Sequence, residues 1–412
     1  MKKYSWFVWL LASGFWSYQL ALRTLGGFTR IPFTGGDVLH SSVSSLLDGT
    51  YYLGFCLFSF LAGAAIDRLG PRGIVSAGAL MSGTGALLIA TNRLGVAATG
   101  EFLQSAGAAV ALLGVIYVSS TFFSPTRMAT LIGITQTIGL AGGFAGAFLA
   151  RATVLREMTW SRFWMGMGLS GFFIAVTLFV FVPVKHATLL PESWRNNPVR
   201  GLGIIVKNPQ SALCALIAGL LFVPAAMLEM VWGTRFLQGE SGFNYSHSVL
   251  LLLAFPLGWT IGCPLWGFCS DYFGRRKPWI LSGGLALLIC LYWILFGRLD
   301  TYLIALLGLA AGIASSASVL VYTVMRESNA ISFAGAATGM LNFFSVSLST
   351  IMFSVCGGRA GAVFASSGIP PEQNQGAPVF ILYGVALAIV LTFGLKETGH
   401  HAQIAARMSE RT

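Results

Sequence analysis

Three ionisable residues, Arg23, Glu101 and Glu229, lie inside long apolar runs of this 412-residue chain. A charge within a membrane helix is costly, so each is a functional hypothesis by default. Counted at 1.5 Å per residue from the outer ends of the predicted helices, all three lie about 8–11 Å below the external surface. The shared depth predicts one polar layer in which Arg23 and Glu101 pair. The alternative is that these side chains reach the membrane surface or form structural pairs.

Polar and aromatic side chains follow the same helical faces as these charges. Asp48 lies close to the start of its apolar run, where solvation at the interface is expected. A guanidinium can hold a carboxylate or phosphate through two parallel hydrogen bonds. A buried carboxyl group can hold a proton near neutral pH because burial disfavours its charged form, so Glu101 and Glu229 are the candidates for proton coupling. The predicted substrate-binding set is Gln19, Arg23, Glu101, Gln104, Glu229, Trp232, Ser318 and Tyr322.

A short polar pattern occurs twice between apolar runs. The copies are Gly63-Ala-Ala-Ile-Asp67-Arg68-Leu-Gly70-Pro71-Arg72 and Gly267-Phe-Cys-Ser-Asp271-Tyr-Phe-Gly274-Arg275-Arg276. The second glycine of each copy permits a sharp reversal between helices, and each aspartate can accept hydrogen bonds from a neighbouring helix N-terminus. The basic residues can pair with acids on adjacent helices or with lipid phosphate. The simpler alternative is a pair of basic cytoplasmic loops with turn glycines.

The composition indicates that lipid is the solvent of this chain. Hydrophobic residues make up 55% of it and charged residues 9%, against about 25% charged residues in soluble proteins. The apolar runs are continuous rather than alternating, which excludes an outer-membrane barrel. The net charge of +11 fits loops facing an anionic inner leaflet better than a nucleic-acid partner. The six cysteines form no CxxC pair, so neither a metal site nor a cofactor is expected.

The predicted fold is an all-α integral membrane protein with twelve transmembrane helices in two pseudo-symmetric six-helix bundles. The expected organisation is an N-terminal bundle (1–184), a cytoplasmic linker (185–209), a C-terminal bundle (210–396) and a cytoplasmic tail (397–412). Spans of about 20 residues are placed at Tyr4–Phe28, Val43–Ile66, Gly73–Ala90, Val96–Phe122, Met128–Ala150, Phe163–Val184, Ser211–Phe236, Ser248–Cys269, Trp279–Phe296, Tyr302–Met325, Ala334–Cys356 and Pro378–Leu395.

The distribution of basic residues predicts the orientation. With the N-terminus inside, every lysine lies on the cytoplasmic side, as the positive-inside rule requires. The six are Lys2, Lys3, Lys185, Lys207, Lys277 and Lys396. Both termini are therefore expected in the cytoplasm, and the expected location is the bacterial cytoplasmic (inner) membrane.

The duplicated loop resembles the signature loop of the major facilitator superfamily of secondary transporters. Tyr18-Gln19-Leu-Ala-Leu-Arg23 looks like the first helix of that superfamily's sugar-phosphate and organic-anion permease branch. The resemblance implies that the two loops close a cytoplasmic gate, that the first, fourth, seventh and tenth helices line a central cavity, and that Arg23 binds an anionic substrate. Phosphate-transporting members carry a second basic residue near the position of Glu229. That departure favours a carboxylate or a zwitterion over a phosphate.

No catalytic or ATP-binding motif is present (HExxH, GxSxG and GxxxxGK[ST] are absent), so the chain is not expected to be an enzyme. The predicted function is secondary active transport of a small anionic or zwitterionic organic solute by alternating access, coupled to a proton or another ion. The expected partners are that solute, the ion and membrane lipid, with the chain acting as a monomer. The alternatives are an exporter of amphipathic compounds, or a sensor or assembly factor that does not transport.

Overall fold

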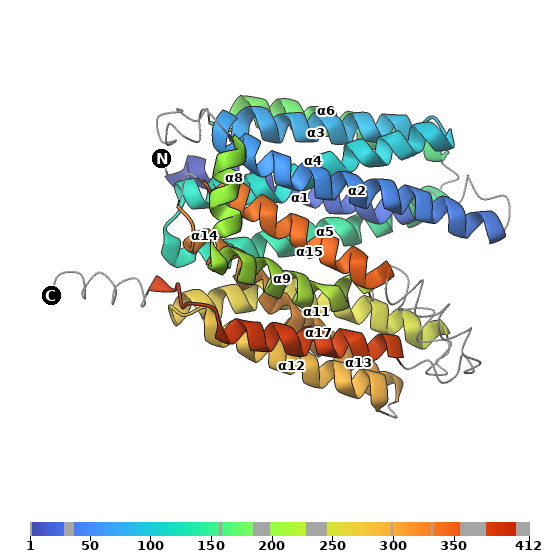
Figure 1. Cartoon of the computed structure of the whole chain (residues 1–412). Helices are drawn as coiled ribbons and strands as arrows, with labels where there is room; N and C mark the ends of the chain where they lie inside the picture. Colours follow the sequence, from blue (N-terminus) through green and yellow to red (C-terminus); the bar gives the residue numbers. More distant parts are fainter. Residues whose placement is uncertain are drawn as a thin grey trace. The chain divides into compact units, whose positions relative to one another are not determined.

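The computed structural model describes residues 2–28, 37–155, 159–183, 198–227, 245–297, 300–330, 333–354 and 376–400. Within these ranges every regular element is a helix (Figure 1). Among the described residues, eight helical segments are long and apolar enough to cross a bilayer. They overlap α2, α3, α4, α5, α6, α9, α12 and the pair α13–α14. The four other predicted spans overlap α1, α11, α15 and α17. The all-helical membrane fold is thus confirmed, and the count of twelve spans stays a prediction.

One compact unit comprises residues 1–124, 138–207 and 329–343. Its main helices are α1 (Lys2–Phe28), α2 (Asp37–Leu69), α3 (Pro71–Ile89), α4 (Leu94–Phe122) and α6 (Trp160–Phe181), followed by the short α8 (Pro198–Lys207). Helix α4 packs against α1, α2 and α3, and α3 also packs against α6. Helix α4 is buried along most of its length, so it forms the core of this unit.

The other unit comprises residues 125–137, 208–328 and 344–412. Its helices are α9 (Pro209–Met227), α11 (Tyr245–Tyr272), α12 (Lys277–Phe296), α13 (Thr301–Ser315), α14 (Val319–Glu327) and α17 (Gly376–Phe393). Helix α13 packs against α11 and α12, α12 packs against α17, and α14 packs against α9. These pairs repeat those of the first unit in the same chain order, which is the pseudo-symmetry predicted from the duplicated loops.

Helices α5 (Met128–Leu155) and α15 (Ala334–Ser354) each contribute to both units. The first turns of α5 belong to the second unit, and the first turns of α15 belong to the first unit. The predicted division of the chain into two bundles joined by the linker stays a prediction. Residues 185–197 of that linker lie outside the described part of the chain.

The span predicted over Tyr302–Met325 is interrupted by a 3-10 turn at Ser316–Ser318, between α13 and α14. The carbonyl oxygen of Ile313 accepts a bond of 2.7 Å from the hydroxyl of Ser316 and one of 2.6 Å from the indole N–H of Trp266. Side chains that take up a backbone carbonyl compete with the helical hydrogen bonds around it. The helix therefore tightens at this point instead of continuing as one regular α-helix.

Candidate functional site

Arg23 on α1 is held by three side chains of α2: Asp48, Tyr51 and Tyr52. Arg23 Nη1 lies 3.2 Å from Asp48 Oδ1, and Arg23 Nη2 donates to Tyr52 Oη at 2.6 Å. The guanidinium carbon lies 4.5 Å from the ring centroid of Tyr51 and 4.8 Å from that of Tyr52. The side chains of Arg23 and Asp48 are 25% and 28% exposed, so protein only partly encloses the ion pair.

None of these three α2 residues was in the predicted binding set. Asp48 was assigned to the interface because it lies near the start of its apolar run. A usable signal was present, however. Tyr51 and Tyr52 follow Asp48 by three and four residues, which places all three on one helical face. A carboxylate and two aromatic rings on one face can surround a guanidinium.

Glu101 on α4 approaches the same part of α1. Its residue exposure is only 5%. A Cβ built on Gly26 would lie 3.2 Å from Glu101 Oε1, and Gly26 follows Arg23 by three residues on the same face of α1. Arg23 also interacts electrostatically with Glu101, although its direct salt bridge is with Asp48. The structure therefore places both predicted charges of the first unit in one neighbourhood, with Asp48 as a third member.

Gln19 and Gln104 are buried between helices of the same unit. Gln19 on α1 donates through Nε2 to Ser82 Oγ on α3, and it lies against Gly107 of α4. Gln104 on α4 is 1% exposed, and its Nε2 has no hydrogen-bond partner among the described residues. Buried amide groups are usually satisfied, so the Gln104 amide is a donor to which a solute or a water molecule could bind.

The remaining members of the predicted set are distributed differently. Ser318 is buried in the 3-10 turn and Tyr322 lies on α14, so both belong to the second unit. Glu229 and Trp232 lie outside the described residues. The binding and proton-coupling roles of all eight residues stay predictions.

The first polar loop brings α2 to the start of α15. Asp67 is fully buried, and its two carboxylate oxygens accept from the backbone N–H groups of Gly335 at 2.9 Å and Ala336 at 2.8 Å. A Cβ on Gly63, one turn earlier, would lie 2.4 Å from the carbonyl oxygen of Gly335. The glycine thus allows the close approach. The aspartate caps N–H groups in the first turn of α15 that have no partner within the helix.

The second polar loop repeats this contact with α5. Asp271 Oδ2 accepts from both the backbone N–H and the hydroxyl of Thr130, each at 2.7 Å. A Cβ on Gly267 would lie 2.5 Å from the carbonyl oxygen of Ala129. Gly274 turns the chain with a φ of 61°, as Gly70 does in the first loop with a φ of 85°. The predicted contact of each aspartate with a helix N-terminus is therefore present in both loops, and the gating role stays a proposal.

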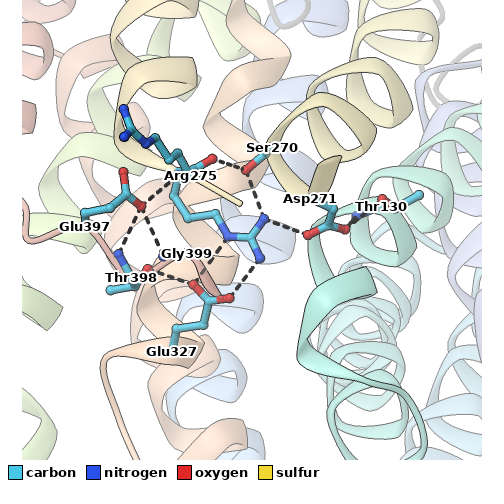
Figure 2. A network of polar contacts seen from close by, with 9 residues as sticks. Thr130, Ser270, Asp271, Arg275, Glu327, Glu397, Thr398 and Gly399 are labelled. Carbon is cyan, nitrogen blue, oxygen red and sulfur yellow. Dashed lines mark hydrogen bonds and ion pairs between the residues drawn. The ribbon is translucent and has the colours of Figure 1, made fainter. Parts of the chain in front are cut away.

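Arg276 is the centre of a buried ionic cluster beside the second loop. Its partners Ser270, Asp271 and Glu327 are labelled in Figure 2. Its guanidinium lies 2.6 Å from Asp271 Oδ1 and 3.0 Å from Glu327 Oε1 of α14, and it also donates to Ser270 Oγ at 3.0 Å. Burial by itself would lower the pKa of Arg276, but the carboxylates of Glu327 and Asp271 outweigh it and raise that pKa above its ordinary value. Arg276 is therefore permanently charged and neutralised by two acids.

The segment that follows α17 completes this cluster (Figure 2). Glu397 accepts from the backbone N–H groups of Arg276 at 2.7 Å and Lys277 at 3.1 Å, which caps the start of α12. In return, Lys277 Nζ donates to the carbonyls of Phe393 and Leu395 at the end of α17. In the first unit, Arg72 makes the matching contact with the end of α6, at the carbonyls of residues 180 and 182.

Comparison with known proteins identifies the family. The sequence model of the protein family described as the Major Facilitator Superfamily matches residues 5–354 of this chain. The chain belongs to the major facilitator superfamily. Members of this superfamily are membrane transporters. The protein is therefore a transporter and not an enzyme, as the sequence predicts.

Two relatives match different shares of this superfamily member. The "Hexuronate transporter" of Bacillus subtilis (strain 168) is 24% identical over 308 residues, which is 71% of this chain and 70% of the relative. The "Multidrug resistance protein Stp" of Mycobacterium tuberculosis (strain ATCC 25618 / H37Rv) is 28% identical over 191 residues, or 45% of this chain and 34% of the relative.

Solved structures of other superfamily members share the fold. The proton:xylose symporter XylE aligns with a TM-score of 0.73 and 14% identity, covering 97% of each chain. The E. coli fucose:proton symporter FucP aligns with a TM-score of 0.69 and 14% identity, covering 94% of this chain and 99% of its own. At this level of identity the similarity concerns the fold alone.

Proposed function

We propose that this protein is a secondary transporter that carries a small organic anion across the membrane together with a proton. Arg23 is the anchor for the anion. The observation that carries the proposal is the partly exposed guanidinium of Arg23, which contacts the rings of two tyrosines and lies near a buried glutamate. An arginine in such a setting is suited to hold a carboxylate through two parallel hydrogen bonds.

Glu101 is the proposed proton carrier in the described part of the chain. It is far more buried than Asp48, so its charge is the more costly of the two when no cation compensates it. When an anion neutralises Arg23, a proton on Glu101 removes that cost. This is the physical reason for linking solute binding at Arg23 to proton uptake at Glu101. Glu229, the second proposed carrier, lies outside the described residues.

The proposed solute class is the sugar acids. A sugar acid combines a carboxylate with several hydroxyls, and Arg23 offers a cation while the Gln104 amide offers an unused donor. A relative covering most of this chain is named a hexuronate transporter, which is consistent with that chemistry. The departure at Glu229 from a second base also favours a carboxylate over a phosphate.

Flux in proteoliposomes tests the proposal. With the pH lower outside, we expect labelled glucuronate to accumulate inside, and we expect a protonophore to abolish this accumulation. Arg23→Ala should reduce uptake by at least tenfold, whereas Arg93→Ala, which removes an exposed arginine before α4, should leave it unchanged. Glu101→Gln should retain exchange of labelled for unlabelled glucuronate but lose accumulation. Uptake that is insensitive to Arg23→Ala would refute the role of Arg23.

Export of amphipathic compounds is the second candidate, because one relative is named a multidrug resistance protein. The same liposomes discriminate the two functions. Movement of amphipathic dyes against their gradient, without glucuronate uptake, would favour export. Absence of flux for dyes and for a panel of carboxylates, together with a protein that co-purifies stably, would favour the sensor or assembly role.

A further inference from the structure

The acid that binds Arg23 directly in this structure is Asp48 of α2. The contact is a single one, between Arg23 Nη1 and Asp48 Oδ1, and at 3.2 Å it is long for a charged hydrogen bond. The other described groups around the guanidinium are the hydroxyl of Tyr52, the rings of Tyr51 and Tyr52, and the nearby carboxyl group of Glu101. Asp48 is the partly exposed carboxylate of this group, with a side chain 28% exposed.

The geometry limits where an anion can reach Arg23. A carboxylate must approach a guanidinium along its N–H edges, and the Tyr52 hydroxyl already accepts from Arg23 Nη2. Asp48 occupies one of these edges through one oxygen. A solute carboxylate that bound through both oxygens would make shorter and stronger bonds. Asp48 and the solute therefore compete for the same donors.

We propose that Asp48 is the counterion of Arg23 in the empty transporter and that the carboxylate of the solute displaces it. This role rests on the proposed function of anion transport. Without a solute or Asp48, Arg23 would be enclosed in the occluded transporter with Glu101 nearby but with no direct ion pair among the described residues, and Asp48 removes that cost. When the solute binds, Asp48 turns toward water, where its partial exposure keeps the loss small.

The charges balance for one proton per carboxylate. Among the described residues, Arg23, Asp48 and ionised Glu101 sum to −1 in the empty site. In the loaded site the solute adds −1 and the proton on Glu101 adds +1, so the sum is again −1. Loaded and empty forms then carry the same charge, and the exchange of Asp48 for the solute requires no other ion.

The consequence is that Asp48 is needed for the return of the empty transporter but not for exchange. Asp48→Asn keeps the shape of the side chain and removes its charge. We expect the variant to bind glucuronate about tenfold more tightly in a thermal-shift titration because the internal competitor is gone. We expect its exchange of labelled for unlabelled glucuronate to stay within about twofold of wild type. Net proton-driven uptake should fall at least tenfold.

The matched control is Asp300→Asn. Asp300 is an exposed N-cap of α13 that accepts from the N–H of Leu303, and asparagine caps helices as well as aspartate does. This variant should behave as wild type, and Asp48→Glu should retain net uptake. Unchanged affinity and unchanged net uptake in a folded Asp48→Asn variant would overturn the role of Asp48 alone. Absence of glucuronate binding and flux in the wild-type protein would overturn the proposed function, and the role of Asp48 with it.

Discussion

Arg23 carries a permanent charge, and contacts of different kinds compensate it. A partly exposed ion pair contributes about 0–1 kcal/mol, while a cation over an aromatic ring contributes about 0.5–2 kcal/mol. The two tyrosine rings therefore stabilise the guanidinium at least as much as Asp48 does. Arg23 can then keep its position when its acidic partner changes. A lysine would not, because an ammonium group lacks the planar fork that both stacks on rings and holds a carboxylate.

Gln104 allows a prediction about stability and binding together. Its buried Nε2 has no partner among the described residues, and an unsatisfied buried donor costs about 1–3 kcal/mol. Replacement by leucine, which has a similar size, should therefore raise the unfolding temperature of the purified protein. Because the amide is proposed to bind the solute, the same variant should bind glucuronate more weakly.

A fall in the unfolding temperature would contradict this prediction. If Gln104→Leu lowered the unfolding temperature, then an ordered water molecule would satisfy the amide in the wild-type protein. The residue would then have a structural role. Gln104→Met, which keeps an unbranched side chain of similar length but carries no amide, is the comparison that separates loss of the hydrogen bond from a change of shape.

At the scale of the elements, two helix starts depend on aspartates from distant parts of the chain. Asp67 caps α15 and Asp271 caps α5. Hydrogen bonds to a charged group contribute about 1.5–3 kcal/mol, and a carboxylate also interacts with the helix dipole. We expect Asp67→Asn to destabilise the protein by about 1–3 kcal/mol, measured by equilibrium unfolding in detergent. Asp271→Asn should cost more, because it also breaks the buried ion pair with Arg276.

Asp300→Asn is the control for these caps. Its carboxylate is exposed where that of Asp67 is buried, so its loss of charge should cost only a few tenths of a kcal/mol. Equal effects of Asp67→Asn and Asp300→Asn would show that burial of the cap does not matter.

Glu397 links the end of α17 to the start of α12. It caps the backbone N–H groups of Arg276 and Lys277, and loss of such a cap costs about 1 kcal/mol. In Glu397→Ala, we expect hydrogen exchange at these two amides to be about fivefold faster, which corresponds to that energy. Thr398→Val removes only the hydroxyl that donates to Glu327 and should leave the two amides protected. Unchanged exchange in Glu397→Ala would contradict the cap.

Some of these features could be predicted from the sequence because they depend on local spacing. The repeated pattern placed Asp67 and Asp271 at helix ends, where acids meet helix N-termini. Asp48 was missed because its partner depends on how α2 rotates against α1, which spacing along one helix does not determine. The break at Ser316 was missed because Trp266, fifty residues earlier, takes up the carbonyl of Ile313. The sequence places Glu397 in the cytoplasmic tail, because its partners on α12 lie far from it in the chain.

At the scale of the whole molecule, two units repeat one set of helix pairs, and the polar loops occupy equivalent positions in each. In each unit a basic residue that follows the loop glycine also binds the last carbonyls of a helix, Arg72 at α6 and Lys277 at α17. Each unit therefore repeats both the helix packing and the helix caps of the other.

The sidedness itself gives the last prediction. All six lysines are predicted to face the cytoplasm, so an amine reagent that does not cross membranes should modify them in inside-out vesicles and spare them in right-side-out vesicles, as read by mass spectrometry. Lys207 and Lys396 are exposed, whereas the ammonium group of Lys277 is hydrogen bonded to two carbonyls. Lys277 should therefore react more slowly than the other two, which provides an internal control on the second loop. Modification of Lys207 or Lys396 from the outside would reverse the orientation and move both loops, with their aspartate caps, to the external face.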